Sequence, residues 1–125
     1  MKPGHTGLSR MVAATGYSLK GLQACFIGEA AFRQELLLVA VLLPLSFWVS
    51  RTPLEWIALV APLFLLLIVE LLNSALEAVV DRVGDEPHVL SGRAKDMGSA
   101  AVLLCLLLIA TSWLPLTYLH VREVL

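Results

Sequence analysis

The chain has 125 residues, which is enough for one domain and too few for two. It is 58% hydrophobic, with a mean hydropathy of +0.83, whereas soluble domains are about 45–50% apolar. The formal net charge is −1, and no basic patch indicates nucleic acid as a partner. These values exclude an ordinary soluble domain and indicate one integral membrane domain over residues 1–125.

The first predicted element is an amphipathic helix over about residues 8–26. Arg10, Tyr17 and Lys20 lie on one side of it, and an apolar stripe lies on the other. Such a helix can lie in the membrane interface with its apolar face toward lipid, or it can pack on other helices. No apolar core of about 7–15 residues precedes it, so we expect no cleaved signal peptide. The apolar stripe consists of Leu8, Met11, Val12, Thr15, Leu19, Leu22 and Phe26.

Three apolar segments follow, and a membrane span needs about 20 mostly apolar residues. The longest stretch without a charged side chain lies between Asp96 and Arg122 and has 25 residues. We therefore predict membrane spans over about residues 28–50, 53–83 and 91–118. The predicted fold class is an all-α membrane protein with an N-terminal amphipathic surface helix and three transmembrane helices.

Boundary signals accompany the second and third spans. Thr52 can cap the second span, Pro53 suits the first helical position, and Glu55 completes a capping box. Gly84 is expected to end this span in the left-handed conformation that glycine tolerates. Ser91 is the expected cap of the third span.

The lysines and arginines predict the orientation, because cytoplasmic loops carry an excess of both. Two of the nine lie beyond the outer ends of the spans, and these are Arg51 and Arg122. The other seven belong to one side and are Lys2, Arg10, Lys20, Arg33, Arg82, Arg93 and Lys95. We therefore expect a cytoplasmic N-terminus and a C-terminus on the opposite side. Three tryptophans should form an aromatic belt near that opposite face, and they are Trp48, Trp56 and Trp113.

A stripe of polar side chains interrupts the second span. Glu70, Asn73, Glu77 and Asp81 fall within about 80° of one another at 100° per helical residue. Glu70 lies roughly 26 Å from the outer end of the helix, near the cytoplasmic edge of a hydrocarbon core about 30 Å thick. Acids that face lipid are costly, so the stripe must face protein, water or a bound cation.

The charges near the cytoplasmic side indicate magnesium and phosphate. Glu77 and Asp81 lie toward a helix C-terminus, and Lys95 is expected in the first turn of the third span; the helix dipole disfavours both placements. Local rules tend to fail at functional sites. Mg²⁺ combines a few carboxylates with phosphate oxygens and water, so a magnesium–phosphate compound fits these charges. Glu29 and Arg33 have the spacing of an ordinary helix ion pair.

Four stretches carry a resemblance to a known family. They are GEAAFRQE from residue 28, VELLNSALEAVVDRVG from residue 69, HVLSGRAKDMGSAAV from residue 88 and GLSRMVAATGYSLKGL from residue 7. Together with the three-span layout, they closely resemble the small bacterial membrane diacylglycerol kinases. The resemblance implies transfer of the γ-phosphate of MgATP to the hydroxyl of diacylglycerol, which yields phosphatidic acid. It also implies a homotrimer in the bacterial inner membrane, with sites shared between subunits and the C-terminus in the periplasm.

The resemblance further implies a role for individual residues. Glu70 would be the general base on the lipid hydroxyl, and Asn73 would support it. Glu29 and Glu77 would hold Mg²⁺. The residues implied to contact ATP are Arg10, Tyr17, Glu29, Glu77, Glu86, His88, Lys95 and Asp96. Those implied to contact the lipid substrate are Arg10, Gln34, Glu35, Glu70 and Ser99.

Other hypotheses remain open. Undecaprenol kinases share these motifs, and a polyprenyl alcohol could also reach Glu70. An ion or proton carrier is a remote alternative, since acids within a membrane often mark such paths, although these acids cluster on one side. A structural anchor or accessory subunit would leave the placement of Glu77 and Lys95 unexplained.

Overall fold

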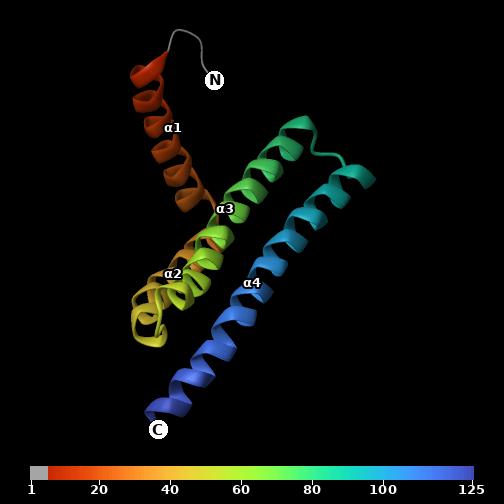
Figure 1. The fold of residues 1–125 in the computed structure, drawn as a ribbon. Helices are drawn as coiled ribbons and strands as arrows, with labels where there is room; N and C mark the ends of the chain where they lie inside the picture. The colour runs from red at the N-terminus through yellow and green to blue at the C-terminus, as the bar shows by residue number, and fades with distance from the viewer. Residues whose placement is uncertain (1–5) are drawn as a thin grey trace.

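The computed structural model describes residues 6–125, and this part of the chain forms four α-helices (Figure 1). Three of the helices are long and apolar enough to cross a membrane, as predicted. Lys2, which contributed to the predicted orientation, lies outside the described residues. The helices are α1 (Gly7–Gly28), α2 (Ala30–Val49), α3 (Pro53–Val83) and α4 (Val89–Val124).

The helix ends and connections gather at two opposite ends of the molecule. The start of α1 and the connection between α3 and α4 lie toward one end, and the α2–α3 connection and the C-terminus lie toward the other (Figure 1). The orientation predicted from the lysines and arginines needs the start of α1 and the α3–α4 connection on the same side, and the structure places them there. The assignment of one end to the cytoplasm stays a prediction.

A single extended residue separates the first two helices. Glu29 has φ −124° and ψ 111°, so α1 ends at Gly28 and α2 begins at Ala30. The predicted start of the first span at residue 28 was therefore two residues early. Because the backbone is extended here, α2 can leave α1 in a new direction (Figure 1).

The predicted start of α3 is confirmed, although its capping box is only half formed. The Thr52 hydroxyl accepts a hydrogen bond from the Glu55 N–H at 3.2 Å. The Glu55 carboxylate accepts from the N–H of Arg51 at 3.0 Å and not from that of Thr52. The Arg51 guanidinium also binds this carboxylate, with Nη2 3.0 Å from Oε2, and thereby holds it one residue away from the predicted partner.

The predicted conformation of Gly84 was wrong. Gly84 follows the last residue of α3, as expected, but its φ of 176° and ψ of 152° describe extended backbone. Bends at Asp85 and Glu86 then lead the chain toward α4, and no residue of this connection has a left-handed backbone.

The predicted start and end of α4 were also wrong. His88 caps the helix, because its Nδ1 accepts a hydrogen bond from the N–H of Leu90 at 3.0 Å. Ser91 consequently lies inside α4, which continues to Val124 instead of ending near residue 118. Lys95 lies in the second turn, so its expected conflict with the helix dipole is weaker than predicted.

The interior lies between α3, α4 and the C-terminal half of α2. Figure 1 shows α3 and α4 side by side along their length. The buried side chains that form the core are Val49, Leu59, Leu63, Leu66, Cys105, Ile109 and Trp113.

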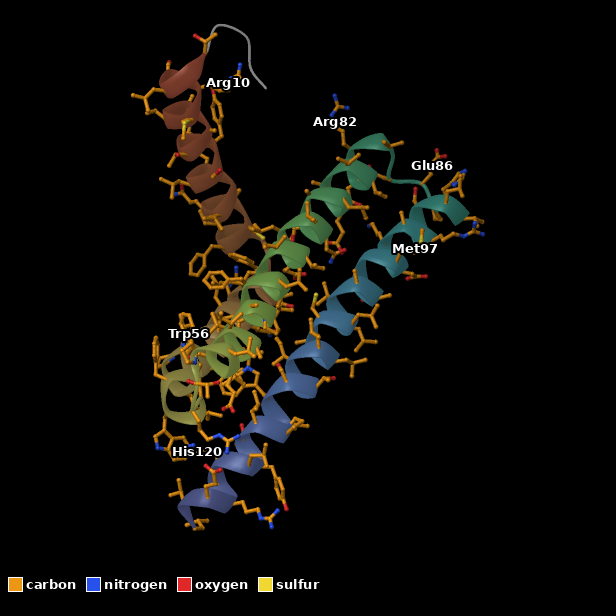
Figure 2. All side chains as sticks on the ribbon, in the orientation of Figure 1. Arg10, Trp56, Arg82, Glu86, Met97 and His120 are labelled. Atoms are coloured by element: carbon orange, nitrogen blue, oxygen red, sulfur yellow. The ribbon has the colours of Figure 1, made fainter. Side chains whose placement is uncertain are left out.

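The three tryptophans do not have the same role, contrary to the predicted belt. Trp113 is buried, and its Nε1–H donates to the carbonyl of Leu59 at 3.0 Å. Trp48 is exposed and contacts the ring of His120, with centroids 4.1 Å apart. Trp56 and His120 lie at the end of the molecule opposite Arg82 (Figure 2). Trp113 is thus a core residue. Its indole N–H can be buried because a backbone carbonyl of α3 accepts its hydrogen bond.

Helix α1 diverges from the other helices, and only its C-terminal part approaches α3 (Figure 1). Cys25 is the buried residue of α1, and its Sγ lies 3.5 Å from Oγ of Ser74. The predicted apolar stripe is exposed from Leu8 to Phe26, which are 75% and 50% accessible. The stripe therefore does not pack on the rest of the chain, and its location in the membrane interface stays a prediction.

Candidate active site

Glu70 is a buried carboxyl group within a membrane-spanning helix. Only 3% of the residue is accessible, and its Oε2 has no hydrogen-bond partner among the described residues. Glu29 and Glu77 are close enough to act on it electrostatically. Glu35 of α2 is also buried and interacts with Glu70. The site is therefore an acidic cluster with an acceptor oxygen left open for a ligand.

Asn73 lies one turn after Glu70 and packs against Gly98 of α4. A Cβ atom at Gly98 would overlap Asn73 Oδ1 and come within 3.1 Å of its Cγ. Small residues at such positions let membrane helices approach closely. The Asn73 Oδ1 atom is buried without a donor in the described part of the chain. The close crossing of α3 and α4 thus fixes the position of the Asn73 side chain.

The end of the polar stripe nearest the α3–α4 connection pairs with α4. Lys95 Nζ donates to Asp81 Oδ1 at 2.8 Å, and both side chains are largely exposed. Exposed ion pairs contribute about 0.2–1 kcal/mol, so this contact adds little to stability. Its main consequence is to hold the Lys95 ammonium beside the end of α3.

A cleft of about 360 Å³ lies where α3 and α4 are joined. It brings together Glu86, His88 and Lys95, which are three of the residues implied to contact ATP. Glu86 and Arg82 lie at this end of the molecule in Figure 2. The cleft is lined by Val80, Asp81, Gly84, Asp85, Glu86, Pro87, His88, Ser91, Gly92 and Lys95.

Other predicted site residues lie apart from this cleft within one chain. Arg10 and Tyr17 lie on α1, and Figure 2 shows Arg10 well separated from Glu86. Glu29 lines a separate hollow of about 410 Å³ between α1 and α3. The remaining predicted residues are exposed at the surface, and they are Gln34, Asp96 and Ser99.

The ion pair that the spacing of Glu29 and Arg33 allows does not form; the ion pairs of the described residues do not include it. Arg33 Nη1 instead donates to the carbonyls of Phe26 and Ile27, at 2.7 and 3.0 Å. Sequence reasoning missed this contact, because it depends on the helix break at Glu29. Asp85, which lines the cleft, was also missed, and its acidic neighbour Glu86 in the loop was the available signal.

Comparisons with known proteins agree with these features. Residues 16–117 match the family model described as prokaryotic diacylglycerol kinase. The diacylglycerol kinase of Escherichia coli (strain K12) is 49% identical over 115 residues, which cover 92% of this chain and 94% of that protein. The diacylglycerol kinase of Pseudomonas aeruginosa is 54% identical over 110 residues, which cover 88% of this chain and 89% of that protein.

A third relative extends the range of organisms. The diacylglycerol kinase of Haemophilus influenzae is 47% identical over 108 residues, which cover 86% of this chain and 92% of that protein. The family match includes the acidic cluster and the cleft between α3 and α4, but not Arg10. The chain is therefore a membrane kinase, and it belongs to the prokaryotic diacylglycerol kinase family.

Proposed function

We propose that this protein transfers the γ-phosphate of ATP to the hydroxyl of diacylglycerol and releases phosphatidic acid and ADP. The observation that carries the proposal is the open Oε2 of Glu70, which is buried within α3 at the predicted edge of the hydrocarbon core. The hydroxyl of diacylglycerol resides at this depth, at the boundary between hydrocarbon and headgroups. The names of the relatives support the choice of acceptor.

Glu70 acts as the general base. As the lipid oxygen attacks the γ-phosphorus, Glu70 accepts the hydroxyl proton and ADP leaves from the opposite side of the phosphorus. Phosphoryl transfer requires mainly positioning and neutralisation of charge, and one well-placed base adds to these. Asn73, held against Gly98, supports the Glu70 carboxylate.

Glu29 and Glu77 are the proposed magnesium ligands. Their carboxylate oxygens suit a hard cation, and both acids lie close to Glu70. No three acidic, histidine or cysteine side chains in the described structure converge closely enough to hold a metal ion alone. Mg²⁺ usually retains water and binds substrate phosphates as well as one or two carboxylates, so the proposed site requires only these two acids from the chain. When bound with ATP, Mg²⁺ neutralises charge on the phosphates.

The cleft between α3 and α4 is the proposed nucleotide site, with Lys95 directed at the phosphates. Arg10, Tyr17, Glu86, His88 and Asp96 complete the ATP contacts, and Gln34, Glu35 and Ser99 help to place the lipid together with Arg10. The position of Arg10 and Tyr17 on α1 suits a site completed by a neighbouring subunit. We propose a homotrimer in the bacterial inner membrane, with a cytoplasmic N-terminus and a periplasmic C-terminus.

The test is a phosphorylation assay with purified protein in mixed micelles, labelled ATP and magnesium. Diacylglycerol and undecaprenol are supplied separately. Transfer of label to diacylglycerol supports the proposal. Preference for undecaprenol retains the mechanism and changes the acceptor. Well-folded protein that labels neither lipid contradicts the proposed reaction and favours a carrier function.

Replacing Glu77 by glutamine should raise the magnesium concentration for half-maximal activity by about tenfold or more, the scale on which changes at metal sites act. The amide has nearly the same shape but lacks the negative charge that binds the cation. Magnesium titrations at saturating ATP measure the effect. Glu123→Gln is the matched control, because Glu123 pairs with Arg51 at the other end of the molecule, far from Glu77. An unchanged magnesium requirement in Glu77→Gln would show that Glu77 is not a ligand.

Two substitutions of His88 should separate its two functions. Asparagine can still cap α4 through its side-chain oxygen but lacks the outer ring nitrogen, so His88→Asn should raise the KM for ATP severalfold with little loss of stability. Glutamine is a poor cap, so His88→Gln should lower the free energy of unfolding by about 0.5–2 kcal/mol. ATP titrations and thermal unfolding in micelles check both results. Equal effects of the two variants on both measurements would contradict this separation.

A further inference from the structure

Arg33 connects α2 to the end of α1. The last carbonyls of a helix have no partner within that helix. Arg33 Nη1 donates to two of them, the carbonyls of Phe26 and Ile27, at 2.7 and 3.0 Å. A cation at a helix C-terminus also interacts favourably with the helix dipole. One side chain therefore satisfies the exposed end of α1 from the first turn of the next helix.

The backbone around Glu29 closes this connection. The N–H of Glu29 donates to the carbonyl of Cys25 at 2.9 Å, and the carbonyl of Glu29 accepts from the N–H of Arg33 at 3.3 Å. Glu29 is thus the last donor to α1 and the first acceptor of α2, and its extended φ and ψ define the bend. The direction of the Glu29 carboxylate depends on this bend.

Few other contacts hold α1. Figure 1 shows α1 leaving the bundle soon after it passes α3. A second tie is the contact between Cys25 and Ser74, whose Sγ and Oγ atoms are 3.5 Å apart. A helix held this sparsely can change its direction when one connection is removed.

We propose that Arg33 is a positioning residue: its hydrogen bonds to Phe26 and Ile27 set the angle between α1 and α2 and thereby place Glu29 at the active site. The consequence for catalysis rests on the proposed function, in which Glu29 binds magnesium. We call the hydrogen bonds from Arg33 to the carbonyls of Phe26 and Ile27 the clasp. The clasp does not depend on the proposed function. Arg33 touches neither substrate nor metal in this scheme and acts through the bend.

Two cysteines allow the clasp to be tested separately from activity. Cys25 is buried where α1 meets α3, and Cys105 is buried in the core formed with α4. The test measures maleimide labelling of each thiol by mass spectrometry in the full-length protein in micelles. The variants are Arg33→Gln and Arg33→Lys, and Arg122→Gln is the matched control on an exposed arginine of α4. Magnesium titrations of kinase activity accompany the labelling.

In Arg33→Gln, Cys25 should react about tenfold faster, the scale of one charge-assisted hydrogen bond, while labelling of Cys105 stays unchanged. The magnesium concentration for half-maximal activity should rise, and Arg33→Lys should recover part of both changes. Unchanged labelling of Cys25, or a parallel rise at both thiols, would overturn the clasp. Faster labelling of Cys25 with an unchanged magnesium requirement would overturn the positioning role. Wild-type protein without lipid kinase activity would refute the proposed function and leave the labelling test of the clasp intact.

Discussion

Replacing Glu70 by glutamine is expected to reduce the turnover of lipid phosphorylation by about 10²–10⁴-fold, the range that a positioned general base contributes. Glutamine preserves the size of the side chain but cannot accept the hydroxyl proton. The measurement is kcat with diacylglycerol and ATP both saturating, in mixed micelles. A rate close to that of the wild type would show that Glu70 is not the base.

Stability separates this effect from unfolding. Glu70 is buried among other acids, and its open oxygen receives no hydrogen bond from the described residues. Removing its charge relieves repulsion with Glu29, Glu35 and Glu77, so thermal unfolding of Glu70→Gln should occur at the same or a higher temperature. Loss of activity together with a lower unfolding temperature would indicate a structural defect instead.

Replacing Gly98 by alanine is expected to lower the free energy of unfolding by about 1–3 kcal/mol, the usual cost of overpacking a close contact. The added methyl group would overlap the side chain of Asn73, so either the asparagine or the helix crossing must shift. Activity should fall as well, because Asn73 supports Glu70 in the proposed mechanism. Thermal unfolding in micelles and kinase assays measure the two effects.

Two further variants make this test specific. Gly92→Ala lies in the same helix with no atom within 4 Å of the added Cβ, so it should be neutral or stabilising, since alanine exceeds glycine in helix propensity by about 0.8–1 kcal/mol. In an Asn73→Ala background the clash disappears, and Gly98→Ala should then cost little stability. The same loss in both backgrounds would show that contact with Asn73 is not the cause.

The fold class and the limits of α3 could be predicted from local signals. A run of apolar residues predicts a membrane span wherever it lies in the molecule, because the bilayer sets the required length. The cap at Thr52 followed by Pro53 predicts a helix start from neighbouring residues alone, and the structure confirms it. The polar stripe was predictable for the same reason, since the helical repeat brings Glu70, Asn73 and Glu77 to one side.

Choices between competing partners could not be predicted in this way. Both His88 and Ser91 were able to cap α4, and the extended backbone at His88 placed its ring nitrogen at the N–H of Leu90. Trp113 suited either a membrane interface or the core, and a carbonyl of α3 decided in favour of the core. Arg33 had an acid at ideal spacing, yet the bend at Glu29 brought backbone carbonyls of α1 closer.

The candidate site follows the same division. The sequence by itself determined which acids share a face of α3, because that depends only on the rise and rotation of one helix. Only the tertiary structure placed Asn73 against Gly98, paired Asp81 with Lys95, and separated α1 from the cleft between α3 and α4. These contacts depend on how helices cross and where the chain bends. Packing between residues far apart in the sequence sets these crossings and bends. A local sequence pattern therefore cannot predict them.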